Sequence, residues 1–169
     1  MSRGFNLLEL TITLVLLSVL LGLAKPSYQA LLNRVKMKRL ASELSGFVIQ
    51  AKSEAVLRNQ RLYAHFSFSS ASFQDNGDWH IQLTDSSTAG GERVLYLSGE
   101  GFLGLAITHN YGLGYLSFDG VRGRPMGGSI EFFPATNNSE RLKAVIANPP
   151  GRIRICGVNG ALYGYAQCH

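Results

Sequence analysis

The stretch RGFNLLELTITLVLLSVLLGLAKPSY, residues 3–28, decides the fold because it sets one charge inside a long apolar run. From Phe5 to Ala24 the only charged residue is Glu9. Twenty helical residues at about 1.5 Å each span about 30 Å, the hydrocarbon thickness of a bilayer. An ionisable group there costs at least ~2.5 kcal/mol at the helix centre, so Glu9 is a candidate functional residue. The alternative is a glutamate near the headgroup boundary that merely reaches water.

The flanks of this apolar run do not match a secretory signal peptide. Arg3 is the only basic side chain before the run, and Lys25-Pro26 follows it in place of a small-residue cleavage site. The segment is therefore expected to stay in the mature protein. After Pro26 the apolar residues continue at steps of three and four, which predicts an amphipathic helix to about Asn59 with a kink at Pro26.

The first residues resemble the processing site of type IV pilins and type II secretion pseudopilins. Gly4, Phe5, Glu9 and Pro26 fall at the family's offsets, whereas Asn6 replaces its usual threonine. The resemblance implies that a prepilin peptidase cuts after Gly4 and that the new amino terminus at Phe5 is methylated. It also implies that the Glu9 carboxylate faces the Phe5 ammonium of a neighbouring subunit and sets the register of a filament, because a buried carboxylate needs such a partner.

From Arg61 onward the hydrophobic pattern changes to period two, which is typical of strands. Eight or nine short strands are predicted, separated by turn signals such as Asn76-Gly77 and Asn159-Gly160. The runs are RLYAHFSF, WHIQLT, RVLYLS, FLGLAIT, GYLSF, SIEFF, LKAVIA, RIRIC and ALYGYA. The expected class is α+β and type IV pilin-like: a long N-terminal helix, membrane-spanning in its first half and amphipathic in its second, packed on an antiparallel β domain. The predicted divisions are a leader peptide at 1–4, a transmembrane or filament-core helix at 5–25, an amphipathic helix at 26–59 and a globular β domain at 60–169.

The net charge of +5 is distributed unevenly along the chain. Residues 25–61 carry +6, residues 62–120 carry −5 and residues 121–169 carry +4. This asymmetry indicates that part of the domain faces an anionic partner, although ordinary solvated surface charge is the alternative.

No motif in the sequence favours an enzyme, a cofactor or a metal site. Residues 99–104 match G-x-G-x-x-G, but a strand-like run follows where a dinucleotide site needs a helix, so the stretch is interpreted as a turn. The four histidines are scattered, without the spacing of a metal site, and there is no G-x-S-x-G elbow. We expect a non-enzymatic protein with no catalytic residues, no cofactor and no metal.

Two arginines alternate in the late stretch PPGRIRICG, residues 149–157. In a strand Arg152 and Arg154 point to one face, about 6.7 Å apart, and Ile153 and Ile155 point to the other. Planar guanidinium forks suit phosphate oxygens, which makes the pair a candidate nucleic-acid contact. The alternatives are pairing with carboxylates of a neighbouring strand, or plain solvation.

The whole chain is similar to the FimT/GspH family of minor pilins and pseudopilins, and most like its FimT members, which are implicated in DNA uptake. Their Gly-Arg-x-Arg motif falls on Gly151, Arg152 and Arg154. The resemblance implies a minor pilin that binds double-stranded DNA through backbone phosphates during natural transformation; Arg141 and Lys143, which alternate on a predicted strand, extend the patch. The alternative is a structural, GspH-like pseudopilin of a type II secretion filament, whose arginines meet other subunits.

Counting positive charges leaves the membrane orientation ambiguous, since the cations from Lys25 to Arg39 outweigh Arg3. The resemblance implies a single-pass protein of the bacterial inner membrane with its β domain in the periplasm. In that compartment Cys156 and Cys168, joined by the Asn159-Gly160 turn, are expected to form a disulfide that ties a C-terminal hairpin. Two free structural thiols are the alternative.

Overall fold

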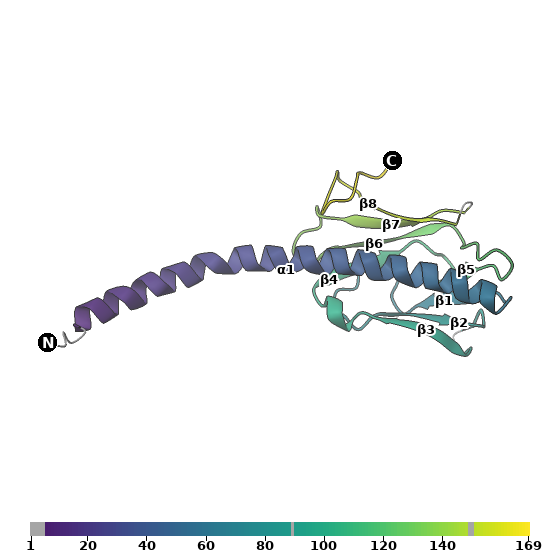
Figure 1. Ribbon diagram of the computed structural model, residues 1–169, viewed down its shortest axis with the longest axis horizontal. Coiled ribbons are helices and arrows are strands. Elements are labelled where there is room, and N and C mark those ends of the chain that lie inside the picture. Colours follow the sequence, from purple (N-terminus) through teal and green to yellow (C-terminus); the bar gives the residue numbers. More distant parts are fainter. Residues whose placement is uncertain (1–5, 89, 149–150) are drawn as a thin grey trace. The chain divides into compact units, whose positions relative to one another are not determined.

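The computed structural model describes residues 6–88, 90–148 and 151–169, and within helix α1 it leaves the side chains of residues 23–27 undescribed. The chain divides into two compact units, Met1–Val35 and Lys36–His169. Helix α1, Leu7–Leu57, contributes its first part to one unit and its second part to the other (Figure 1). The two units are therefore described in turn.

The N-terminal unit is an apolar helix whose large side chains lie exposed. Leu7 is 78% exposed and Leu20 is 65% exposed. The hydroxyls of Thr11, Thr13 and Ser18 each donate to a backbone carbonyl three residues earlier, at 2.7–2.8 Å, which satisfies these polar groups within the helix. Among the described residues, no helix holds an apolar stretch long enough to cross a membrane.

The second part of α1 buries one stripe of side chains in the globular unit. Its buried residues recur three or four positions apart along one face, with Leu40 and Ala41 adjacent, namely Met37, Leu40, Ala41, Leu44, Val48, Ala51 and Ala55. The helix ends at Leu57, where Asn59 turns to a positive φ of 48°. The predicted end near Asn59 is therefore confirmed to within two residues. The backbone remains helical through Pro26, and the kink stays a prediction.

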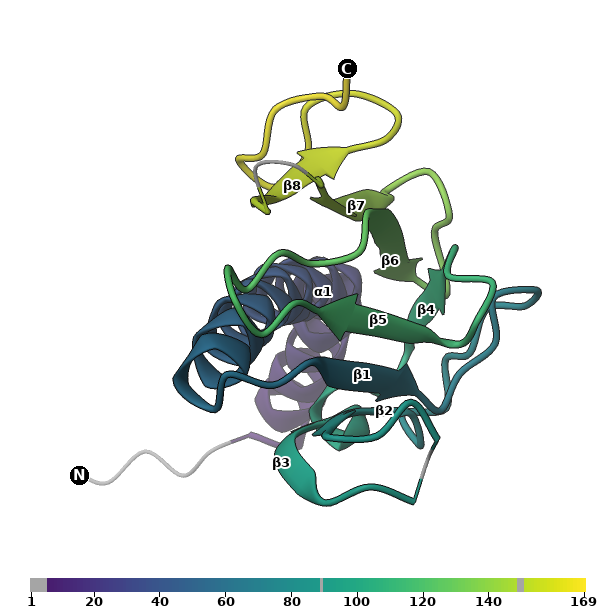
Figure 2. The ribbon, with the colours of Figure 1, turned by 90° about the vertical axis from the view of Figure 1, so that its right-hand side faces the viewer.

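Within the described residues, eight strands form two four-stranded antiparallel sheets, with the second part of α1 lying against them (Figure 2). The strands are β1 Leu62–Phe66, β2 His80–Thr84, β3 Arg93–Ser98, β4 Leu105–His109, β5 Tyr115–Phe118, β6 Gly128–Pro134, β7 Leu142–Ile146 and β8 Ile153–Gly157. One sheet has the order β3-β2-β1-β5 and the other β4-β6-β7-β8, so β8 is an edge strand. Buried residues of α1 and of both sheets join in a single core.

Two expectations about the strands need correction. The run ALYGYA, residues 161–166, forms only isolated bridges and turns, because Gly160, Tyr163 and Gly164 all have positive φ and interrupt an extended strand. The C-terminal segment therefore meets β8 as a parallel bridge from Gly157 to Gln167, and the predicted hairpin is wrong. The run FLGLAIT becomes a strand only from Leu105.

The turn expected over the G-x-G-x-x-G match is confirmed. A short 3₁₀ helix, Glu100–Phe102, lies there, and Gly104 follows with φ +85°. The flanking strands β3 and β4 belong to different antiparallel sheets. The segment therefore connects two sheets and is no part of a βαβ unit.

Candidate nucleic-acid interface

The two arginines of the Gly-Arg-x-Arg motif lie together at the β8 edge of the second sheet. Arg152 immediately precedes β8 and Arg154 lies within it, and both are exposed. Arg154 stands opposite Val145 of β7 in the register of the sheet, so the two side chains share one face. Both arginines line one surface hollow of about 160 Å³, together with Val145, Ala147 and His169.

The alternating isoleucines anchor this strand from its other face. Ile153 and Ile155 are half-buried and pack against the core cluster. Register and burial together leave the guanidiniums of Arg152 and Arg154 on the solvent side. Within the described residues neither guanidinium makes an ion pair, whereas Arg39, Arg58, Arg141 and Lys143 each do. The alternative of pairing with a neighbouring strand's carboxylate therefore finds no support here.

Gly151 fixes the path of the chain into Arg152. Its φ is +74°, a conformation that suits glycine, and its N–H donates to the Ala147 carbonyl at 2.9 Å. Its own carbonyl accepts a hydrogen bond from Lys52 Nζ of α1 at 2.7 Å. A Cβ added at this position would lie 3.0 Å from Pro125 Cδ. Helix α1 and the loop before β6 therefore hold the residue that precedes the arginine pair.

The contact from Lys52 was not expected from the sequence. The two residues are 99 positions apart, and no local pattern marks Lys52 as different from other helix lysines. Arg122 and Arg124 repeat the Arg-x-Arg spacing of Arg152 and Arg154, but the sequence did not lead us to predict them as site residues.

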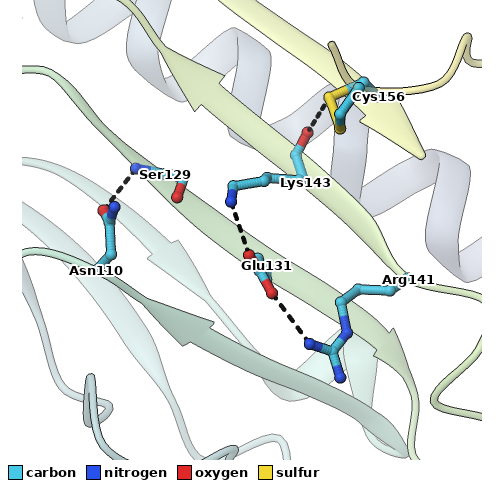
Figure 3. A network of polar contacts seen from close by, with 7 residues as sticks. Asn110, Ser129, Glu131, Arg141, Lys143 and Cys156 are labelled. Atoms are coloured by element: carbon cyan, nitrogen blue, oxygen red, sulfur yellow. Dashed lines mark hydrogen bonds and ion pairs between the residues drawn. A yellow bond between two sulfur atoms is a disulfide. The ribbon is translucent and has the colours of Figure 1, made fainter. Parts of the chain in front are cut away.

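Arg141, which immediately precedes β7, and Lys143, which lies within it, both form ion pairs with the same carboxylate, that of Glu131. Arg141 Nη1 lies 3.2 Å from one oxygen of Glu131, and Lys143 Nζ lies 3.0 Å from the other (Figure 3). The Arg141 guanidinium also stacks over Phe73 and Phe133, at 5.1 and 4.7 Å from the ring centroids. The structure therefore does not join these two cations to the hollow of Arg152 and Arg154, and their role in DNA binding stays a prediction.

The predicted disulfide between Cys156 and Cys168 is present, with Cα atoms 5.0 Å apart. Cys156 is buried at the end of β8. The bond, together with the hydrogen bond from Cys168 N–H to the Gly157 carbonyl at 2.9 Å, returns the C-terminal segment to this strand. It thereby places His169 beside the hollow that the arginines line.

The assembly residues fall in the other unit. Gly4 and Phe5 lie outside the described residues. Glu9 is exposed near the start of α1 and has no ion-pair partner within the described residues. No group of three or more histidine, cysteine, aspartate or glutamate side chains suited to a metal ion occurs in the part of the chain that the structure describes.

Comparison with known proteins places these observations in a family. Residues 40–151 match the family model of type II transport protein GspH. Two Pseudomonas aeruginosa proteins described as fimbrial proteins are each 29% identical over 119 residues, which cover 63% of this chain and 77% of the relative.

Two crystal structures of the type IV minor pilin FimU from P. aeruginosa superpose on the chain with TM-scores of 0.54 and 0.50. They share 17% and 16% identity, and the alignments cover 72% and 70% of this chain and 89% and 90% of FimU. The predicted α+β, pilin-like fold is confirmed. The family match ends at Gly151, so Arg152 and Arg154 lie just beyond it.

Proposed function

The chain belongs to the GspH family of type II transport proteins, which comprises minor pilins and pseudopilins, and from this premise we propose that it is a minor type IV pilin that binds double-stranded DNA. Binding runs through backbone phosphates, is independent of base sequence and supports DNA uptake in natural transformation. The protein acts as a non-enzymatic component of a filament, with other pilin subunits as its structural partners.

The observation that carries this proposal is the unpaired arginine couple at the sheet edge. Arg152 and Arg154 are exposed, share one hollow and have no carboxylate partner among the described residues. A guanidinium presents a planar fork of donors that matches phosphate oxygens, and phosphate contacts carry no sequence information. Ile153 and Ile155 pack against the core and hold the backbone of the strand in place, so binding has to order only the two arginine side chains.

The assembly role rests on the N-terminal unit. In this proposal a prepilin peptidase removes residues 1–4 by cutting after Gly4, and residues 5–25 hold the protein in the inner membrane with the β domain in the periplasm. The exposed leucines of α1 then pack against the same segment of neighbouring subunits, and Glu9 pairs with the Phe5 ammonium of one of them.

The second candidate function is a structural pseudopilin of a type II secretion filament. The description of the matched family model favours it, because GspH is named there as a type II transport protein. In that case Arg152 and Arg154 would face acidic surfaces of other subunits, and DNA would not be a ligand.

The test measures how DNA binding by the full chain, in a non-ionic detergent, depends on salt concentration. Binding is measured by the fluorescence anisotropy of a labelled duplex. Each phosphate contact lowers the slope of log K against log salt by about 0.9. Replacing both arginines, Arg152→Ala with Arg154→Ala, should therefore flatten the slope by about two units. Replacing both with lysine should preserve binding only in part, since the charge stays but the bidentate fork is lost.

Arg93→Ala is the matched control. Arg93 is exposed on β3 of the other sheet, so its loss removes one of the two positive charges that the double variant loses, but away from the hollow. Its slope should equal that of the parent, and a scrambled duplex should bind as well as any other. A folded double-alanine variant that keeps the parent's slope would contradict the site. Failure of the parent to bind DNA at low salt would favour the secretion filament.

A further inference from the structure

A second pair of cations lines a hollow that Asn148 also borders. Arg61, which precedes β1, and Arg124, which precedes β6, line a hollow of about 410 Å³ together with Ser117, Asp119 and Asn148. Both arginines are exposed, and neither forms an ion pair within 4 Å in the described part of the chain. The hollow therefore presents two guanidiniums, a hydroxyl and an amide to solvent.

The aspartate in this hollow is engaged by its own turn. The backbone N–H of Arg122 donates to Asp119 Oδ2 at 3.0 Å. Hydrogen bonds from the N–H groups of Arg122 and Val121, followed by the charges of Arg61 and Arg124, hold the pKa of Asp119 below its usual value. One carboxylate thus faces two guanidiniums, and the hollow keeps a net positive charge.

The two hollows adjoin each other. Asn148 lines the larger hollow and Ala147 the smaller one, and consecutive Cα atoms are about 3.8 Å apart. The Cα of Arg124 lies 3.9 Å from the position that a Cβ of Gly151 would take, and Gly151 precedes Arg152. These contacts limit the separation of the Arg124 and Arg152 Cα atoms to about 9 Å, which is less than the combined reach of two arginine side chains.

We propose that Arg61 and Arg124 form a second phosphate-binding locus, so that one DNA duplex contacts the cations of both hollows. The inference rests on the proposed function and extends it to residues outside the Gly-Arg-x-Arg motif. A duplex carries a phosphate about every 3.4 Å along each strand, so two cationic hollows this close meet phosphates of the same duplex.

The experiment measures the salt slope of duplex binding by the full chain in non-ionic detergent. Arg124→Ala should flatten the slope by about one unit, and Arg61→Ala with Arg124→Ala should flatten it by about two, with Arg152 and Arg154 intact. Arg124→Lys should keep most of the slope, because the charge remains. Arg93→Ala is again the control, and the melting temperature of each variant confirms that it is folded.

The possible outcomes separate the two proposals. If the folded Arg61→Ala, Arg124→Ala variant keeps the parent's slope while Arg152→Ala with Arg154→Ala loses it, the second locus is wrong and the proposed function stands. If the Arg61→Ala, Arg124→Ala variant binds DNA as the parent does but is recovered in sheared filaments in a different amount, the hollow contacts another subunit and the second locus is also wrong. If the parent binds no DNA, the proposed function fails and this inference fails with it.

Discussion

Replacing Gly151 with alanine tests whether the arginine pair works through its geometry or merely through its charge. The substitution keeps every charged residue in place. It forces a side chain onto a residue with φ +74°, which costs roughly 1–2 kcal/mol for an L-residue. The new Cβ would also lie 3.0 Å from Pro125 Cδ, so the loop has to shift away from the segment before β6.

The magnitude of the stability loss follows from the size of the globular unit, Lys36–His169. For a unit of this length 1 kcal/mol corresponds to roughly 4 °C in Tm, so Gly151→Ala should lower Tm by about 4–8 °C. The shift also weakens the hydrogen bond from Lys52 Nζ and turns Arg152 away from the hollow. Loss of one charge-assisted contact of about 1.5 kcal/mol weakens DNA binding about tenfold.

The matched control is Gly114→Ala. Gly114 has nearly the same φ, +70°, but an added Cβ would meet no atom within 4 Å, and the residue lies just before β5 in the other sheet. The control should lose a similar amount of stability and bind DNA as the parent does. Thermal unfolding by circular dichroism and duplex binding by anisotropy measure the two effects. If Gly151→Ala also binds DNA as tightly as the parent, the positioning role of the loop is refuted.

Three further predictions follow from the same contacts. Glu131→Gln should release Arg141 and Lys143 from their ion pairs with Glu131 and steepen the salt slope of DNA binding by up to about two units. An unchanged slope would show that these two residues are not part of the DNA interface. Replacing Cys156 and Cys168 with serine removes the disulfide, which stabilises the fold by about 3 kcal/mol, so Tm should fall by about 10 °C. Reducing the disulfide of the parent should lower Tm by a similar amount, and a parent whose Tm does not fall on reduction would contradict this account. Burial lowers the pKa of His109 from 6.5, so the folded state binds a proton less readily than the unfolded chain does. The free energy of unfolding, measured by urea titration, should therefore drop as pH falls below about 6.5. A free energy of unfolding that does not change with pH in this range would contradict the prediction.

The elements that the sequence predicted well are those with local causes. The end of α1 follows from a stripe at helical spacing, and the β strands follow from alternation between turn residues. The disulfide was predicted from two cysteines separated by the Asn159-Gly160 turn, yet the predicted hairpin is wrong. The positive φ of Tyr163 is the kind of feature that alternation cannot reveal, because an aromatic residue normally favours an extended strand.

The parts of the site that could not be predicted depend on contacts between distant segments. The hydrogen bond from Lys52 to Gly151 requires the packing of α1 against the loop before β8. The pairing of Glu131 with Lys143 requires the register of β6 and β7, in which the two residues stand opposite each other. A one-residue slip in that register would place Glu131 on the other face of the sheet.

This register explains why cations of the same sheet differ in what they can bind. Glu131 stands between Arg141 and Lys143 and accepts from both, and their side chains are only 26% and 33% exposed. On β8, the edge strand next to β7, Arg154 stands opposite Val145. In the described sheet no carboxylate lies beside Arg154. A carboxylate at position 145 would pair with Arg154 as Glu131 pairs with Lys143. Because Val145 carries no charge, it leaves the guanidinium of Arg154 to an external anion. Val145→Glu should for this reason abolish the contribution of Arg154 to the salt slope while the fold and both arginines remain, and an unchanged slope would show that Arg154 does not contact DNA.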